Sequence, residues 1–352
     1  MSRQLKFAAA ILEATDQAME RDKGVYVIGL GVPDPKGIFG TTLGLQEKYG
    51  AERVLDMPLS ENAMTGVVIG SALVGMRPIL THQRVDFAIL AMEQMVNQAA
   101  KWHYMFGGKH KVPIVVRMII GRGWGQGPQH SQSLQSWFAH VPGLKVVMPT
   151  TAHDAKGLLL ASVEDDNPVI FLEHRWLHGV SDNVPQDYYT VPIGKARVMR
   201  GGTDVTIVAT SYMALEALRA AELLEREDVS AEVIDLRAIR PWDQEAVLAS
   251  VRKTGRLVVA DTSWKMFGIA GEIVATATEE AFEALKAAPE RVALPDAPTP
   301  TSPALADHYY PRAGEIVQAA RRTMGLPPST ADFGPLPGQR LDAPDPSFQG
   351  PF

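Results

Sequence analysis

The stretch Asp56-Met-Pro-Leu-Ser-Glu-Asn-Ala-Met-Thr-Gly-Val-Val-Ile-Gly-Ser-Ala-Leu-Val-Gly75 predicts a buried helix with a carboxylate at its start. Ser60 is a typical N-cap, so we expect the helix to begin directly after it. Gly66 and Gly70 are four residues apart and therefore share one face of the helix. Each glycine costs a helix roughly 1 kcal/mol relative to alanine. We therefore expect this face to pack closely against another backbone.

Glu61 is the only charged residue between Ser60 and Gly75. The helix dipole favours an anion in the first turn, so Glu61 could simply stabilise the start of the helix. A carboxylate held in an apolar wall can instead exchange a proton with a ligand. The residues alone leave both interpretations open.

Short apolar strands alternate with helices on both sides of this stretch. The strands are expected at 25–30, 54–55, 77–81, 112–117, 144–148, 168–173, 204–210, 231–236, 257–260 and 292–294. The other helices are expected at 4–21, 42–49, 87–104, 152–163, 214–226, 243–253, 270–286 and 313–324. This alternation predicts an α/β fold with parallel sheets covered on both faces.

The predicted architecture is two doubly wound α/β domains. The first spans 1–180 and the second 203–324, with a polar connector at 181–202. The Pro/Gly-rich tail at 325–352 has no periodicity, so we expect it to be disordered or docked on a partner.

Composition excludes several classes of function. The net charge is −6 and there is no basic run, which argues against nucleic acid and against an anionic membrane as partners. The absence of cysteine excludes disulfides, thiolate metal sites and cysteine nucleophiles, and it is typical of a cytoplasmic protein. No apolar segment approaches the length that spans a membrane.

The histidines offer two candidate sites. His130 lies in the glycine-rich segment 121–132, where it could stabilise the loop or act as a general acid or base. His174 and His178 are four residues apart, but His174 ends a predicted strand, so a surface strand end is favoured over a pair of metal ligands. The dinucleotide, P-loop and nucleophile-elbow motifs are all missing from the sequence.

Many segments match one family in order along residues 4–324. They include Arg53-Val-Leu-Asp-Met-Pro-Leu-Ser-Glu61, Gln94-Met-Val-Asn-Gln-Ala-Ala-Lys101, Gly127-Pro-Gln-His-Ser-Gln132, Val141-Pro-Gly-Leu-Lys-Val-Val-Met-Pro149 and Asn167-Pro-Val-Ile-Phe-Leu-Glu173. The chain resembles the beta subunit of the thiamine-diphosphate-dependent first component of 2-oxo acid dehydrogenase complexes. Pyruvate, branched-chain and acetoin dehydrogenases belong to this group.

The resemblance implies a transketolase-like pyrimidine-binding domain, a transketolase C-terminal domain and an α2β2 heterotetramer with an alpha subunit. It implies oxidative decarboxylation of a 2-oxo acid, with acyl transfer to the lipoyl group of a dihydrolipoyl acyltransferase. In this family the alpha subunit holds the diphosphate and Mg²⁺ through a Gly-Asp-Gly motif. This chain has no Gly-Asp-Gly, in agreement with its being the beta subunit.

The resemblance also assigns roles to individual residues. Glu61 matches the carboxylate that pairs with the aminopyrimidine ring of thiamine diphosphate, and Phe87 matches the aromatic residue that packs against that ring. His130 matches the loop histidine that lines the lipoyl channel. A structural K⁺, held mainly by backbone carbonyls, would lie at Ile114, Ser162, Val163, Asp165 and Asn167.

Three further residues in the expected cofactor site depart from the family pattern. Leu30 and Gly31 stand where an acidic pair is usual, and Gln83 stands where an apolar contact with the pyrimidine is expected. These changes leave open a non-oxidative carboligase or decarboxylase of a specialised pathway. A non-catalytic interaction protein is a third hypothesis, but the retention of Glu61, Phe87 and His130 argues against it.

Overall fold

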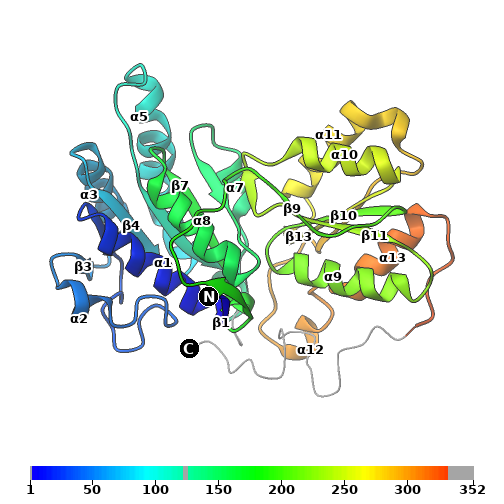
Figure 1. Ribbon diagram of the computed structural model, residues 1–352, viewed down its shortest axis with the longest axis horizontal. Coiled ribbons are helices and arrows are strands. Elements are labelled where there is room, and N and C mark those ends of the chain that lie inside the picture. Colours follow the sequence, from blue (N-terminus) through cyan, green and yellow to red (C-terminus); the bar gives the residue numbers. More distant parts are fainter. Residues whose placement is uncertain (1, 122–125, 332–352) are drawn as a thin grey trace. The chain divides into compact units, whose positions relative to one another are not determined.

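Buried aliphatic strands form a parallel sheet in each half of the chain. The computed structural model describes residues 2–121 and 126–331 and divides into two compact units (Figure 1). Unit 1 contains residues 2–120 and 137–193. Unit 2 contains residues 121, 126–136 and 194–331.

The sheet of unit 1 has six parallel strands in the order β6-β7-β5-β4-β2-β3. They are β2 (Val25–Ile28), β3 (Val54–Leu55), β4 (Arg77–His82), β5 (Val115–Ile120), β6 (Lys145–Val147) and β7 (Val169–His174). Every residue of β2, β5 and β7 is buried. Such unbroken apolar runs are typical of strands covered on both faces, which explains why the alternation of the sequence predicts them.

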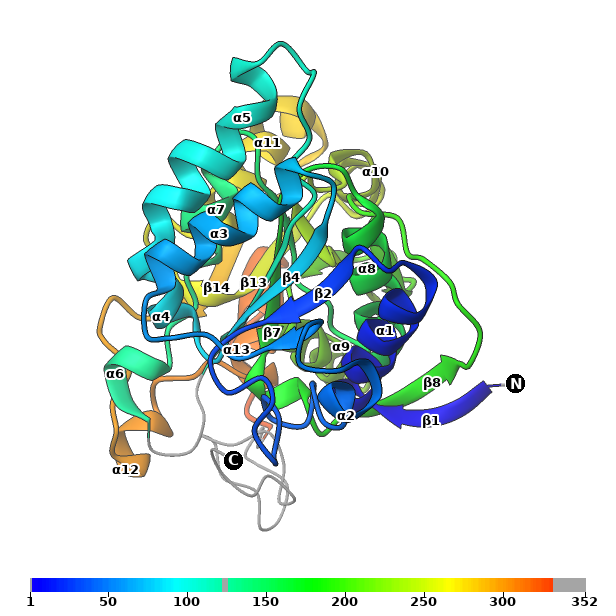
Figure 2. The same ribbon diagram turned by 90° about the vertical axis from the view of Figure 1, so that its left-hand side faces the viewer.

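Helices cover both faces of this sheet. Figure 2 shows α1 (Phe7–Arg21) and α8 (Ala152–Glu164), which pack together, on one side of strands β2 and β4. On the other side lie α3 (Glu61–Leu73) and a segmented helix. This segmented helix consists of α4 (Val85–Ala88), the 3₁₀ turn η1 (Ile89–Ala91), the π-helix η2 (Gln94–Ala99) and α5 (Ala100–Met105).

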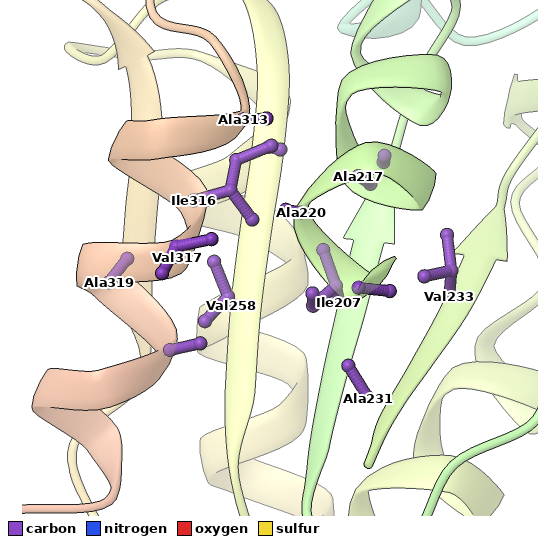
Figure 3. Close-up of a cluster of buried hydrophobic side chains, with 14 of the residues drawn as sticks. Ile207, Ala217, Ala220, Ala231, Val233, Val258, Ala313, Ile316, Val317 and Ala319 are labelled. Atoms are coloured by element: carbon purple, nitrogen blue, oxygen red, sulfur yellow. The ribbon is translucent and has the colours of Figure 1, made fainter. Parts of the chain in front are cut away.

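Unit 2 has a second sheet, in the order β14-β13-β10-β11-β9. Its strands are β9 (Arg197–Arg200), β10 (Val205–Ala209), β11 (Ala231–Asp235), β13 (Leu257–Trp264) and β14 (Glu290–Leu294), of which β9 alone is antiparallel to its neighbour. Helices α9 (Tyr212–Glu225) and α13 (Ala313–Thr323) pack together over a core that includes Ile207, Val233, Val258 and Ile316 (Figure 3). Helices α10 (Gln244–Thr254) and α11 (Ile269–Ala281) form another packed pair.

Short elements complete the described chain. They are β1 (Ser2–Lys6), α2 (Leu45–Tyr49), α6 (Gly127–His130), α7 (Gln135–Ala139), η3 (Arg175–Leu177), β8 (Ser181–Pro185), β12 (Ala238–Arg240), η4 (Phe282–Ala284) and α12 (Pro303–Ala306). Among the residues described, no helix is both long and apolar enough to cross a membrane.

The structure differs from the sequence-based expectation at the start of the chain and in the connector. Residues 4–6 are not helical, because β1 pairs in antiparallel fashion with β8. The segment 181–202, expected as a polar connector, contains the two strands β8 and β9. Both strands pair with partners far away in sequence, which a local pattern does not reveal. Most of the expected tail, residues 332–352, lies outside the described residues.

Candidate functional site

The carboxyl ends of β2 and β4 form the switch point of the unit 1 sheet. After β2 the chain runs to β3 at one edge, and it then returns to β4 on the other side of β2. Ligands of open α/β sheets bind in the crevice at such a point. Leu30 and Gln83 follow these two strands, and Gln83 Nε2 donates a hydrogen bond to the Leu30 carbonyl oxygen at 3.2 Å. The structure therefore brings these two sequence candidates together.

Glu61 is the first residue of α3, as the Ser60 N-cap predicts. Its side chain is only 6% exposed. Within the described ranges no residue donates a hydrogen bond to its carboxylate, and Ser60 makes no side-chain cap bond either. With no donor from the described residues, the carboxylate is suited to a donor that comes from outside the chain. Its place in the first turn of α3 is also that of a helix-stabilising acid.

Phe87 lies on α4, immediately after β4, and is half-buried. The turn η1 continues from α4 and packs against α3, the helix that begins with Glu61. Neighbouring elements of one unit thus contribute Glu61 and Phe87. Like Leu30 and Gln83, they lie on segments that follow the carboxyl ends of strands β2, β3 and β4.

His130 ends the short helix α6 and belongs to unit 2, whereas Glu61 belongs to unit 1. Gly127 begins α6 with a φ of 63°, and a Cβ atom there would lie 2.5 Å from Thr301 Oγ1. Only glycine fits this turn without strain. The histidine is half-buried. Residues 122–125 of the predicted glycine-rich loop lie outside the described residues.

The five positions expected to hold K⁺ lie around the junction of α8 and β7. Four of them lie in 162–167, and the Ile114 carbonyl accepts a hydrogen bond from the Val169 amide at 2.9 Å. Asp165 Oδ1 accepts from the Asn167 amide at 2.9 Å. The carbonyl oxygens of Val163 and Asp165 also accept from Arg77 Nη1, at 2.9 and 3.1 Å. Backbone carbonyls are suitable ligands for K⁺, and each retains a second lone pair here.

Sequence reasoning missed a buried ion pair between two adjacent strands. Arg117 on β5 donates from Nε to Glu173 Oε1 at 2.7 Å and from Nη2 to Oε2 at 3.1 Å, and both side chains are fully buried. Burial favours the neutral carboxyl, but Arg117 and His178 outweigh it and hold the pKa of Glu173 below its usual value. The sequence did carry a signal for this ion pair, because each of the two apolar strands contains one charged residue.

The interpretation of His174 and His178 as a surface strand end is wrong. Both are only 4% exposed: the ring of Phe7 stacks on His178 and Phe39 packs edge-on against it, while the Trp176 ring packs edge-on against His174. Burial lowers the pKa of His174 to about 3. No cluster of three or more potential metal-ligating side chains occurs within residues 2–121 and 126–331.

Comparison with known proteins identifies both halves of the chain. Residues 3–179 match the transketolase pyrimidine-binding domain, and residues 194–316 match the transketolase C-terminal domain. A solved structure described as a split-gene transketolase, an inactive β4 tetramer, has a TM-score of 0.75 and 23% identity. The match covers 92% of this chain and 99% of the chain of that solved structure. This likeness shows the fold alone.

Three curated proteins give closer matches in sequence. The beta subunit of acetoin:2,6-dichlorophenolindophenol oxidoreductase from Cupriavidus necator is 46% identical, over 92% of this chain and 98% of its own length. Its Bacillus subtilis counterpart is 40% identical over 93% and 99%. Pyruvate dehydrogenase E1 component subunit beta-2 from Oryza sativa is 43% identical over 91% and 86%. The chain belongs to the family of beta subunits of thiamine-diphosphate-dependent 2-oxo acid dehydrogenases.

Proposed function

We propose that this chain supplies the pyrimidine-recognising half of an active site that it shares with an alpha subunit in an α2β2 heterotetramer. The observation that carries the proposal is Glu61, a buried carboxylate at the switch-point side of the sheet with no donor among the described residues. The relatives are named as subunits, which supports a second chain.

The residues present fit the aminopyrimidine of thiamine diphosphate. The Glu61 carboxyl would pass a proton to a ring nitrogen and, once ionised, accept the hydrogen bond from the protonated ring, and Phe87 offers an aromatic face. The Gln83 amide is held by the Leu30 carbonyl, which fixes the adjoining wall of the site. When bound, thiamine diphosphate supplies the carbanion stabilisation that decarboxylation requires. We assign the diphosphate and Mg²⁺ to the alpha subunit, because this chain has no Gly-Asp-Gly.

The outer face of α3 supports association with another chain. Val67 and Val74 are 56% and 81% exposed, and a Cβ atom added at Gly70 would touch nothing within 4 Å among the described residues. The close packing that the glycine spacing predicts is found at Gly66, where an added Cβ atom would lie 3.3 Å from Gln94 Oε1, but not at Gly70 within the described part of the chain. Exposed valines beside an open glycine suit contact with another chain. A partner subunit is the occupant we propose.

His130 is proposed to serve the lipoyl group of a dihydrolipoyl acyltransferase. Its place at the end of a fixed turn suits a positioned acid or base. In a His130→Ala enzyme, activity with an artificial electron acceptor should exceed activity with a lipoyl domain, relative to wild type. Equal losses in the two assays would remove His130 from the lipoyl step.

We also propose a K⁺ ion bound by the backbone carbonyl oxygens of Ser162, Val163, Asp165 and Asn167, with Ile114 as the fifth ligand. Its role would be to fix the junction of α8 and β7. Replacement of K⁺ by choline at constant ionic strength should lower the midpoint of thermal unfolding. An unchanged midpoint would count against the ion.

The direct test of the function is co-expression with candidate alpha subunits. The purified complex is then assayed with a panel of 2-oxo acids and acetoin, using an artificial electron acceptor. Reduction of the acceptor that depends on both subunits and on thiamine diphosphate is the expected result. Consumption of the 2-oxo acid with carbon–carbon bond formation, and without reduction of the acceptor, would instead identify a non-oxidative carboligase.

A further inference from the structure

Gln135 attaches the segment that carries His130 to strand β13 of the second sheet. We call residues 126–136 the His130 segment; they belong to unit 2. Gln135 Nε2 donates a hydrogen bond to Asp261 Oδ1 at 2.8 Å and another to Thr262 Oγ1 at 3.2 Å. Gln135 is fully buried and Asp261 is 1% exposed. The attachment is therefore shielded from water.

Further contacts hold the His130 segment on both sides of the histidine. After it, Ser263 Oγ donates a hydrogen bond to the Ser133 carbonyl oxygen at 2.9 Å. Before it, Gly127 lies so close to Thr301 that no larger residue fits. All of these contacts lie within unit 2. The backbone that leads to and from His130 is thus held by the unit that contains the second sheet.

The hydrogen bond of Gln135 lies at the switch point of that sheet. From β10 the chain runs to β11 on one side, and it later returns to β13 on the other side of β10. Thr210 directly follows β10, and Asp261 follows Ala260, the last residue of β13 that pairs with β10. Open α/β sheets usually bind their ligands at such a point. In this unit a side chain of the same polypeptide reaches it.

Asp261 makes this attachment unfavourable to break. Its Oδ1 atom also accepts hydrogen bonds from Thr210 Oγ1 and from the Thr262 amide, both at 2.8 Å. Burial raises the pKa of Asp261, whereas the donors favour its ionised form. A buried carboxylate is costly unless donors satisfy it. Release of Gln135 would remove one of these donors, so the carboxylate opposes displacement of the His130 segment.

We propose that Asp261 and Gln135 are positioning residues for His130. Their hydrogen bond holds the His130 segment at the carboxyl end of β13, so that the imidazole meets the lipoyl group from a fixed backbone. The switch point of the second sheet then binds an internal side chain in the place of a ligand. This inference rests on the lipoyl role proposed for His130.

The test begins with Gln135→Met, which keeps the length of the side chain but removes the donor. The variant is assayed as the complex with the alpha subunit. Misplacing a reacting group by about 1 Å can cost on the order of 10²-fold in rate. We therefore expect kcat with a lipoyl domain to fall at least tenfold, with little change in KM for that domain. Activity with an artificial electron acceptor should fall less than twofold.

A double variant shows whether Gln135 acts through His130. Residues that act through one another give non-additive losses, so His130→Ala with Gln135→Met should be no slower than His130→Ala alone. Losses that multiply would overturn the proposal. A selective loss of lipoyl activity in His130→Ala but not in Gln135→Met would overturn this inference alone. A selective loss in neither variant would remove the lipoyl role of His130, and the inference with it.

Hydrogen exchange gives a readout that does not depend on activity. Amides of the His130 segment should exchange faster in Gln135→Met than in wild type. Asp261→Asn keeps a carbonyl acceptor and should retain more lipoyl activity than Asp261→Ala. Exchange at the wild-type rate in Gln135→Met would overturn the proposal.

Thr206→Val is the matched control. Thr206 is a fully buried residue of β10, and its Oγ1 atom forms a hydrogen bond with Ser250 Oγ at 2.7 Å. The substitution breaks a buried hydrogen bond of the same unit without touching the His130 segment. It should leave the ratio of the two activities and the exchange of the segment as in wild type. A selective loss of lipoyl activity equal to that of Gln135→Met would show a general effect of destabilisation and overturn the proposal.

Discussion

At the scale of single residues, Glu61 is the side chain on which the proposed chemistry depends. The residue is buried and no described residue donates to its carboxylate, which leaves that carboxylate for a ligand. Glu61→Gln preserves the shape but cannot take up a proton. General acid–base groups contribute roughly 10²–10⁴-fold to rate, so turnover by the complex should fall at least about a hundredfold while subunit association stays intact.

A matched control for this substitution is Glu47→Gln. Glu47 is also a first-turn glutamate, but it is exposed on α2. The complex with Glu47→Gln should have the turnover number of the wild-type complex. If Glu61→Gln lost less than tenfold in turnover, Glu61 would be a helix-stabilising residue and the proposed proton transfer would be wrong.

His82 predicts an acid-sensitive fold. The ring is 2% exposed, its Nε2 has no hydrogen-bond partner among the described residues, and burial lowers its pKa from 6.5 to about 4. The unfolded chain therefore binds the proton first, so stability falls as the pH drops from 6.5 to 4. A shift of this size corresponds to about 3 kcal/mol.

His82→Leu should reduce this pH dependence, as measured by urea unfolding midpoints between pH 7 and pH 4. His308→Leu, which replaces an exposed histidine, serves as the control and should keep the wild-type pH dependence. A His82→Leu chain whose midpoint fell as steeply as that of wild type would show that His82 does not cause the acid sensitivity.

At the scale of elements, helix α3 links the cofactor residue to the proposed interface. Gly70 has helical backbone and open space around its Cα, so Gly70→Ala should raise the free energy of unfolding of the isolated chain by about 1 kcal/mol. Gly70→Leu also fits the isolated chain but fills the space that a partner would need. We expect it to abolish co-purification with the alpha subunit.

Met266→Leu is the control for co-purification, because Met266 is 58% exposed and lies in unit 2. It should leave assembly unchanged. Normal assembly of the Gly70→Leu chain would place the subunit interface elsewhere.

The elements also show where sequence reasoning succeeds and where it fails. β7 and α3 were predictable, because an unbroken apolar run and an N-cap are local signals. The start of α1 was placed too early, because the strand before it depends on pairing with β8. The Arg117–Glu173 pair was also missed, because its geometry depends on strands β5 and β7 becoming neighbours.

In the candidate site, too, the residues could be predicted from the sequence, whereas their packing could not. The sequence named Glu61, Phe87, Gln83 and Leu30 through the family resemblance, and the fold places all four on segments that follow the carboxyl ends of β2, β3 and β4. What the sequence did not contain is the lack of a donor for Glu61, which depends on three-dimensional packing. The roles of these residues and of His130 stay predictions.

At the scale of the whole molecule, the chain consists of two α/β units of one family, each with its own sheet. We retain the domain limits 1–180 and 203–324 as a proposal. The central claim remains that this chain forms only half of a cofactor site.

Titration of thiamine diphosphate with Mg²⁺ into the isolated chain and into the co-expressed complex tests that claim most directly. The chain provides a pyrimidine contact but no Gly-Asp-Gly diphosphate site, so calorimetry should show weak or no saturable binding by the chain alone. The complex should bind the cofactor tightly, with affinity reduced by Glu61→Gln. Tight binding by the isolated chain would contradict the account.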